Sequence, residues 1–331
     1  MALLFIDGFD HYVTAEIARK WSTSAGNAAI SATGRRATSK SLSISSANDR
    51  VTLQLPAAEG TLCVGFAYYS TSAPSGHEGV EFAISGAAQC TVFFNANGSI
   101  SVARGAYNGT VLGTSAIGLI KANTWQYVEF KAVIHDSTGT YEVKVNGVSV
   151  LSGTGADTKG QTTADADQLT IQGSGVAILI DDLYLDDADF LGDCRVDTLM
   201  PNGAGASSQW TPSAGSNFQN VDDAGDMDDD TTYNSDDTAG QIDTYTLPDI
   251  EATGGTIHAV AVNSAVRKDD AGARSTKNIV RQATTNYEGA AYSVTDSYLV
   301  KQDIWATQPD ASGAWDETDL NAAEFGIKLE A

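Results

Sequence analysis

The densest group of side chains that could do chemistry is an acidic run between residues 222 and 237. Asp226, Asp228 and Asp230 occupy alternate positions, which is the 1-3-5 ligand spacing of a calcium-binding loop. Such a loop also needs glycine at position 6 and a bidentate glutamate at position 12, where this chain has Thr231 and Asp237. No flanking helices are predicted. These departures favour a solvated acidic loop, and a calcium loop is the alternative.

Hydrolysis of glycosidic bonds needs a pair of carboxylates. A strand directs two carboxylates into one cleft only when they occupy alternate positions, such as i and i+2. Glu78 and Glu81 are three residues apart, so a strand would direct them to opposite faces. Glu129 and Glu142 each stand alone among aromatic or lysine neighbours. We therefore expect the chain not to be an enzyme.

Histidine and cysteine residues indicate no other reactive centre. The four histidines lie far apart, at His11, His77, His135 and His258. None of them belongs to a closely spaced metal-binding pair. Cys63, Cys90 and Cys194 form no CxxC pair, and the first two fall within apolar strand patterns. Buried free thiols are the expected state.

The strongly negative net charge limits which kinds of partner the chain could bind. The formal net charge is −23, whereas binding to nucleic acid or to an anionic membrane requires clustered Lys and Arg. The N-terminus has no basic segment, and its apolar run is too short for a signal peptide or a membrane span. We therefore expect that the chain neither binds nucleic acid nor inserts into a membrane. We expect it to be made in a cytoplasm and not exported by the usual route, and its acidic surface to keep it soluble.

Many short strands must position these residues. The chain of 331 residues has 42% hydrophobic residues, with 32 Gly against 6 Pro, a composition that favours tight turns between strands. One modest helix is expected over residues 14–21. The expected strands of a first domain, residues 1–193, are 3–6, 41–44, 51–55, 62–69, 79–83, 90–94, 100–103, 125–134, 141–145, 148–151, 169–171 and 177–185. Strands of this number and spacing predict a β-sandwich.

A second domain, residues 194–331, is predicted to be a small β-sandwich, with a jelly roll as one candidate topology. Residues 201–245 are rich in Gly, Ser, Asn and Asp and indicate loops. Residues 256–267 and 274–284 are expected to form a long hairpin. A strand over 291–302 and a short element ending at 325–329 follow.

The segment from Trp125 to Leu151 carries the clearest strand pattern. Its first strand places large apolar side chains on both faces, as expected inside a sandwich, and Asn146-Gly147 suits a type I′ hairpin turn. The segment resembles the central hairpins of laminin-G-like, concanavalin-type lectin domains. The first strand, ending at Asp7, and the last, with Ile180-Asp181-Asp182-Leu183, resemble the pair that closes such a jelly roll.

This lectin resemblance implies a second candidate calcium site. In several concanavalin-type relatives, a structural Ca²⁺ is held by a carboxylate of the last strand together with groups near the first. By motif position, Asp181 would be the last-strand ligand and Asp7 a contributor. The alternative is that Asp181 and Asp182 simply cap or flank an outer strand. No cofactor other than Ca²⁺ is expected.

Other segments resemble recurring pieces of tailed-bacteriophage structural proteins. They are residues 5–12, 190–193, 195–203 and 321–328. This resemblance implies a non-enzymatic virion protein made in the bacterial host cytoplasm, acting in a tail, a fibre or decoration. It also implies other virion proteins as partners and a homo-oligomer, for which a trimer is one candidate.

Host surface glycans are a further expected partner, because exposed aromatic faces stack on sugar rings. Tyr68, Tyr69, Tyr107 and Trp125 are the candidates in the first domain, although adjacent Tyr68 and Tyr69 must point to opposite faces. The alternatives are a polysaccharide depolymerase, with carboxylates gathered from distant strands, and an architectural connector without a ligand.

Overall fold

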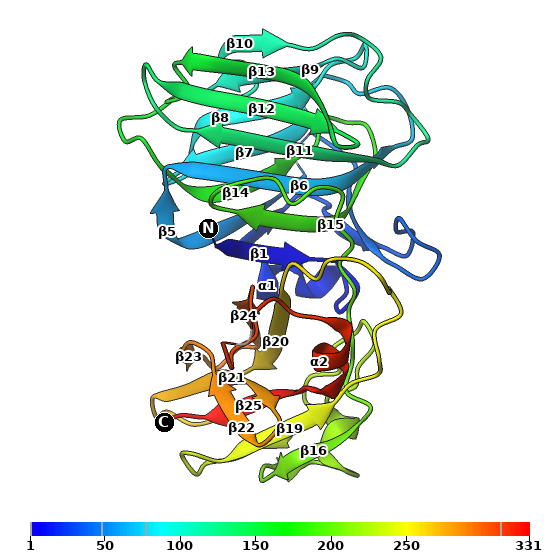
Figure 1. The fold of residues 1–331 in the computed structure, drawn as a ribbon, viewed down its shortest axis with the longest axis vertical. Coiled ribbons are helices and arrows are strands. Elements are labelled where there is room, and N and C mark those ends of the chain that lie inside the picture. Colours follow the sequence, from blue (N-terminus) through cyan, green and yellow to red (C-terminus); the bar gives the residue numbers. More distant parts are fainter. Residues whose placement is uncertain (1, 48, 77, 312) are drawn as a thin grey trace. The chain divides into compact units, whose positions relative to one another are not determined.

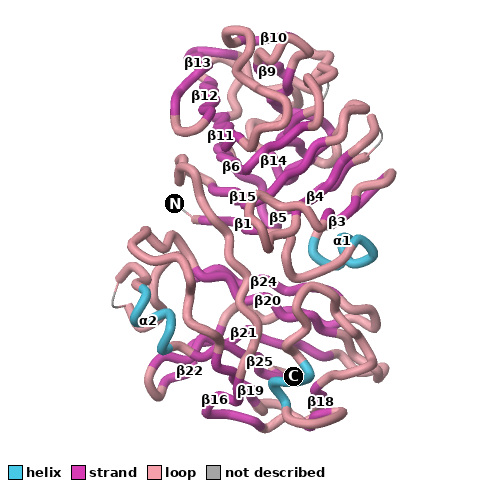
Figure 2. The backbone as a smooth tube through the Cα atoms, turned by 90° about the vertical axis from the view of Figure 1, so that its right-hand side faces the viewer, coloured by secondary structure: helices cyan, strands magenta, loops and turns pink. Residues whose placement is uncertain are grey.

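The computed structural model describes residues 2–47, 49–76, 78–311 and 313–331 (Figures 1 and 2). The predicted all-β fold class is confirmed. The described helices are short: η1 (Thr14–Glu16), α1 (Ile17–Lys20), η2 (Asn217–Asn220) and α2 (Glu317–Ala322). None of them has the length and apolar character that a membrane span requires. The chain divides into two compact units, residues 1–196 and 197–331.

Unit 1 is a sandwich of two antiparallel sheets (Figure 1). Sheet A is ordered β13 (Val148–Ala156), β12 (Gly139–Val145), β11 (Gln126–Val133), β6 (Thr61–Ser70), β15 (Ile178–Asp186), β4 (Ser41–Ile44) and β3 (Ala29–Ser31), with β1 (Leu3–Asp7) also paired to β15. Sheet B is ordered β10 (Thr110–Thr114), β9 (Ile100–Arg104), β8 (Ala87–Phe94), β7 (Gly79–Ile84), β14 (Ala166–Gln172), β5 (Arg50–Glu59) and β2 (Thr23–Ala25).

Alternating side chains build the core between these sheets. Phe130 of sheet A stacks on Phe82 of sheet B with ring centroids 5.0 Å apart. Tyr68 meets Phe94 edge to face at 4.6 Å. All four side chains are buried. Because side chains alternate along a strand, the residues between them, such as Glu129 and Glu81, lie on the outward faces of the two sheets.

The predicted central hairpin is confirmed. β11 pairs with β12 in regular antiparallel register. Asn146 and Gly147 both have positive φ, at 50° and 76°, as a type I′ turn requires. The first and last strands also pair as predicted, with Leu3 opposite Asp186. The short strands β2, β3 and β10 were not predicted, because they are polar, partly exposed edge segments without a strong apolar alternation.

Unit 2 has one larger sheet and two strand pairs. The larger sheet is ordered β16 (Gly203–Ser208), β19 (Ile242–Thr246), β25 (Glu324–Leu329), β21 (Arg274–Gln282) and β22 (Thr285–Glu288), with β23 (Tyr292–Val294) also on β21. The two pairs are β17 (Thr211–Pro212) with β18 (Asn234–Ser235) and β20 (Val260–Val266) with β24 (Leu299–Trp305). Val262, Val280, Trp315 and Phe325 form its core.

The long hairpin predicted from residues 256–267 and 274–284 is wrong. Both strands exist, but β20 pairs with β24 along its whole length. One edge of β21 is taken by β25, and the other is shared by β22 and β23. No edge of β21 is therefore left for β20, although the two strands are neighbours in sequence. The alternation of apolar and polar residues indicates where the strands lie, but it does not indicate which strands pair.

The stacked aromatic pair supplies a stability test for unit 1. We expect Phe82→Ala to lower the free energy of unfolding by about 3–5 kcal/mol, because it opens a cavity beneath Phe130. Val148→Ala is the control, since Val148 is 63% exposed and its loss should change the free energy by less than about 0.5 kcal/mol. Urea titration of both variants measures this. Equal effects would contradict the described core.

Candidate functional site

The first candidate position, Asp181, lies where β15 is bulged. The pairing register of β15 with β6 shifts between Asp181 and Tyr184, and Asp182 has a φ of 50°. Asp181 accepts hydrogen bonds from the backbone of Arg35 at 2.8 Å and from the Ser39 hydroxyl at 3.0 Å. Burial, and secondly the charge of Asp182, raise the pKa of Asp181 to about 6. The bonds from Arg35 and Ser39 reach Oδ2, and Oδ1 accepts the Asp182 N–H at 2.7 Å, so both oxygens are bonded to donors of the chain.

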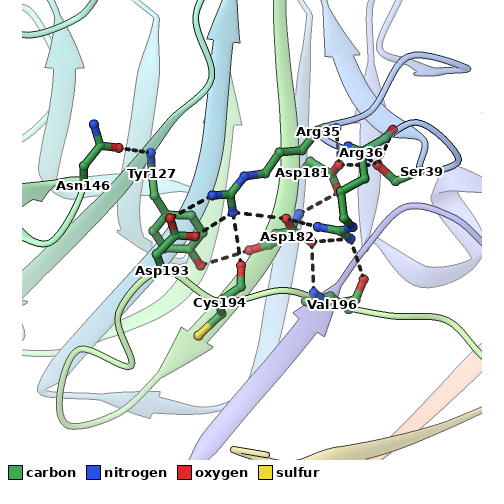
Figure 3. Close-up of polar contacts among 10 residues, drawn as sticks. All are labelled: Arg35, Arg36, Ser39, Tyr127, Asn146, Asp181, Asp182, Asp193, Cys194 and Val196. Carbon is green, nitrogen blue, oxygen red and sulfur yellow. Dashed lines mark hydrogen bonds and ion pairs between the residues drawn. The ribbon is translucent and has the colours of Figure 1, made fainter. Parts of the chain in front are cut away.

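Asp182 is the centre of an arginine cluster (Figure 3). Arg36 binds both its oxygens, at 2.6 and 2.9 Å, and Arg35 approaches Oδ2 at 3.4 Å. The backbone N–H of Val196 donates to Oδ1 at 2.9 Å. Arg35 also holds both oxygens of Asp193, at 2.6 and 2.7 Å. Asp182 is fully buried, so the cluster binds the segment after β15 to unit 1.

This segment, residues 187–196, covers part of the outward face of sheet A, and we call it the strap. Phe190, Leu191 and Cys194 pack on a buried group formed by Cys63, Ala67, Tyr127 and Tyr184. Glu129 accepts hydrogen bonds from the Tyr184 hydroxyl at 2.6 Å and from the Gly192 N–H at 2.9 Å. Gly65 leaves room for the Tyr184 ring, which a Cβ there would meet at 2.1 Å.

Asp7 has a different set of partners from Asp181. Its Oδ2 accepts hydrogen bonds from the Tyr12 hydroxyl at 2.7 Å and from Trp21 Nε1 at 2.9 Å. Its Oδ1 accepts one from the Phe9 N–H at 2.9 Å and lies 3.2 Å from Lys20 Nζ. Burial opposes ionisation, but Lys20 and the hydrogen bonds from Tyr12 and Phe9 hold the pKa of Asp7 below its usual value.

The carboxylates of the acidic run in unit 2 also accept hydrogen bonds from the chain. Asp228 accepts hydrogen bonds from the Thr232 N–H and hydroxyl, at 3.2 and 2.6 Å. Asp230 accepts them from Arg267 at 2.7 Å and from the Tyr298 hydroxyl at 3.0 Å. Among the residues that the structure describes, no three His, Cys, Asp or Glu side chains form a group that could hold a metal ion. Calcium binding by Asp7 and Asp181, or by Asp226, Asp228 and Asp230, stays a prediction.

The carboxylates weighed as a catalytic pair have separate surroundings. Glu78 is buried and binds the N–H of Ser75 at 2.8 Å and the Ser174 hydroxyl. Glu81 lies on the outward face of sheet B beside Thr91, at 3.5 Å, and burial raises its pKa. Cys63 and Cys90 are buried free thiols, as predicted, and burial raises the pKa of Cys90 to about 12. His77 lies outside the described residues.

The outward face of sheet B carries a band of polar side chains across neighbouring strands. Thr52 and Thr170 contact each other at 3.0 Å, and Gln168 donates to Gln54 at 2.7 Å. Glu81 and Thr91 continue the row through paired strands. These are uncharged groups for the most part, and each retains further hydrogen-bonding capacity.

An open hollow of about 550 Å³ lies at the β8–β9–β10 end of this face. Its lining residues are Phe93, Asn95, Ala96, Asn97, Ser99, Ser101, Val111 and Thr114. Phe93 is 6% exposed and forms part of the wall, and Val111 is 51% exposed. Asn95 donates to the Ser101 hydroxyl at 2.8 Å, which contacts the Thr114 hydroxyl at 2.9 Å. We call this the sheet B hollow.

Sequence reasoning missed the sheet B hollow. Its polar groups come from the end of β8, the turn after it and the strands β9 and β10, and β10 was not predicted. The available signal was the alternation of Thr91, Phe93 and Asn95, which places these three residues on one face. The expected aromatic platform is only partly formed. Tyr68 is core, whereas half-buried Tyr69 lies against Trp125 with ring centroids 5.4 Å apart.

Comparison with known proteins gives structural likeness only. No protein-family model matches the chain, and no curated protein matches it in sequence. An alginate lyase structure has 11% identity and a TM-score of 0.39, covering 59% of this chain and 98% of the lyase. Lectin II from Ulex europaeus has 12% identity and a TM-score of 0.36, covering 49% and 91%. A galectin from Caenorhabditis elegans has 10% identity and a TM-score of 0.31, covering 44% and 95%. These likenesses concern the β-sandwich fold alone.

The arginine cluster predicts a large effect of a single side chain. We expect Asp182→Ala to lower the free energy of unfolding by about 3 kcal/mol, because it leaves two guanidinium groups without their buried partner. Alanine also tolerates the positive φ less well than aspartate. Asp157→Ala is the control, because the Arg104–Asp157 pair is more than a third exposed on both sides and should contribute less than about 1 kcal/mol. Urea titration compares the two variants, and equal losses would contradict the assigned role.

Melting experiments test the two calcium predictions. A bound ion would raise the melting temperature when CaCl₂ is added and lower it when a chelator is added, because it binds the native state alone. Asp181→Asn and Asp228→Asn would then distinguish the two places by abolishing the shift. An unchanged melting temperature in both conditions would contradict both predictions.

Proposed function

We propose that this chain is a non-enzymatic glycan-binding protein of a tailed-bacteriophage virion, acting in adhesion or decoration, and that the sheet B hollow binds the glycan. The observation that carries the binding proposal is the composition of that hollow. Val111 supplies exposed apolar surface beside the buried Phe93 ring, while Asn95 and Thr114 supply neutral amide and hydroxyl groups. A sugar ring needs both, since it has an apolar face and a rim of hydroxyls.

The two sheets differ in what their outward faces offer. The strap packs over part of sheet A through Phe190, Leu191 and Cys194. On sheet B, the hollow is open, and the polar band leads away from it across β7, β14 and β5. This arrangement favours an extended oligosaccharide on sheet B. A shallow site binds a single glycan weakly, so several copies of the protein on one particle would be needed for firm attachment.

The virion assignment rests on the sequence resemblance of residues 5–12, 190–193, 195–203 and 321–328 to phage structural proteins. Assembly as a homo-oligomer with other virion proteins follows from the same resemblance. Two other functions compete with it. A polysaccharide depolymerase would shorten host polysaccharide on incubation with the purified protein. An architectural connector would leave a glycan array blank and have its sheet B face covered by a neighbouring subunit in a reconstructed virion.

Substitutions in the sheet B hollow test the binding proposal. We expect Asn95→Ala and Thr114→Val to weaken binding of a neutral oligosaccharide about tenfold each, because each removes a hydrogen bond contributing about 1.4 kcal/mol. The ligand is first chosen on a glycan array and the affinity then measured by titration calorimetry. Binding should change little between about 50 and 500 mM NaCl, since the hollow holds no charged side chain.

Thr23→Val is the matched control, because Thr23 lies on β2 at the opposite edge of the same sheet. It should bind like the unmodified chain. A blank array, or variants of Asn95 and Thr114 that bind as well as the control, would contradict the proposal.

A further inference from the structure

The hydrogen bonds of the sheet B hollow take their direction from one backbone N–H group. The N–H of Ser99 donates to Oδ1 of Asn97 at 3.0 Å. A backbone N–H can only donate, so this contact identifies the oxygen of the Asn97 amide. The Ser99 hydroxyl donates to the same oxygen at 2.8 Å. Its single proton is therefore used, and Ser99 Oγ can take part in further hydrogen bonds only as an acceptor.

Asn95 supplies the hydrogen bond that Ser99 accepts. Its Nδ2 donates to Ser99 Oγ at 3.0 Å and to Ser101 Oγ at 2.8 Å, so both protons of the amide nitrogen are used. Asn95 is half-buried and lines the hollow. Because no group of the described residues donates to its Oδ1, this oxygen is an acceptor for a ligand.

The same direction continues from Ser101 to Thr114. These residues are opposite each other in the pairing of β9 with β10, and their hydroxyl oxygens are 2.9 Å apart. Ser101 is 3% exposed, and within the described part of the chain its proton has no acceptor other than Thr114. Buried hydroxyl groups are almost always hydrogen-bonded, so Ser101 donates and Thr114 accepts. The proton of the exposed Thr114 hydroxyl is then left for a ligand.

The hollow thus presents an acceptor at Asn95 and a donor at Thr114. Two hydroxyls on adjacent carbons of a sugar ring match this pair, because each hydroxyl can either donate or accept. A carboxylate or sulfate group has no proton to donate to Asn95, and the hollow has no cationic side chain that would attract it. The hollow therefore favours neutral sugars with unsubstituted hydroxyls.

We propose, on the basis of the proposed function, that the hollow binds a neutral sugar through two free, adjacent hydroxyls. The first hydroxyl donates to Asn95 Oδ1, and the second accepts from Thr114 Oγ1. Ser101 is a positioning residue, which does not contact the sugar but fixes the direction of both hydrogen bonds. Acylation or alkylation of the first hydroxyl removes the proton that Asn95 requires, so the hollow excludes glycans that are substituted there.

Deoxyfluoro sugars test the two directions, because fluorine accepts hydrogen bonds weakly and cannot donate them. The methyl pyranosides of glucose, galactose and mannose are titrated into the unmodified chain by NMR. The singly fluorinated forms of the one that binds most tightly follow. We expect fluorination of one hydroxyl to weaken binding about tenfold. Fluorination of an adjacent hydroxyl should weaken binding less than about threefold.

Variants assign these two hydroxyls to their protein partners. In Asn95→Ala, fluorination of the first hydroxyl should cause no further loss of affinity, because its acceptor is already absent. In Thr114→Val, the same should hold for the second hydroxyl. Thr23→Val, at the opposite edge of sheet B, is the control and should retain the full contrast between the two fluorinated sugars.

Ser101→Ala tests the positioning role. We expect it to weaken binding of the parent pyranoside about fivefold and to reduce the contrast between the two fluorinated sugars, because the Thr114 hydroxyl can then accept as well as donate. A purely structural role would weaken binding of all the sugars equally. Ser101→Thr keeps the hydroxyl and should restore the contrast.

The outcomes separate this inference from the function on which it rests. Equal losses for every fluorinated sugar, or a Ser101→Ala variant that is folded and keeps the full contrast, would overturn the inference alone. So would binding of none of the three pyranosides alongside a positive glycan array. A blank array as well would contradict the proposed function. The fluorinated sugars are measured on the unmodified chain, so the test holds even where Ser101→Ala fails to fold.

Discussion

The left-handed backbone of Asp182 and its carboxylate form the constraint on which much of unit 1 depends. This φ of 50° inside a strand lies where the pairing register of β15 with β6 shifts. The carboxylate then receives Arg35 and Arg36 from a loop that precedes β4 and the N–H of Val196 from the end of the strap. Segments separated by about half of the chain thus meet at one side chain, and two half-buried arginines bind that buried carboxylate.

The β-sandwich of unit 1 has two outward faces, and they differ in what covers them. On sheet A, the strap packs Phe190 and Leu191 over small or aromatic residues, and Glu129 fixes Gly192. On sheet B, amide and hydroxyl side chains face outward and end at the hollow beside Phe93. The same alternation of side chains produces both faces. Their difference arises from the ten residues of the strap, which follow β15, and it underlies the proposal that sheet B binds the glycan.

Side-chain alternation made most of unit 1 predictable. Residues such as Phe66, Val128 and Phe130 alternate strongly enough to define their strands, and Asn146-Gly147 defines a turn. The sequence predicts less well which strands pair, because an antiparallel edge accepts any strand of suitable length. For this reason β20 was expected to pair with β21, whereas it pairs with β24. The candidate carboxylates can be singled out from the sequence, but Lys20, Arg35 and Arg36, which bind Asp7 and Asp182, come from separate segments. The hollow combines three elements, one of them a polar edge strand with no apolar signal of its own.

The strap has a practical consequence for dividing the molecule. The sequence suggests a boundary at residue 193, and the structure has the last hydrogen bond to Asp182 at Val196. A fragment that ended at residue 193 would expose Cys63 and Tyr127 on sheet A where Cys194 packs on them, and it would remove one donor from the Asp182 carboxylate. Expression of unit 1 alone should therefore extend to Val196, since a shorter fragment would be prone to self-association through the uncovered apolar surface.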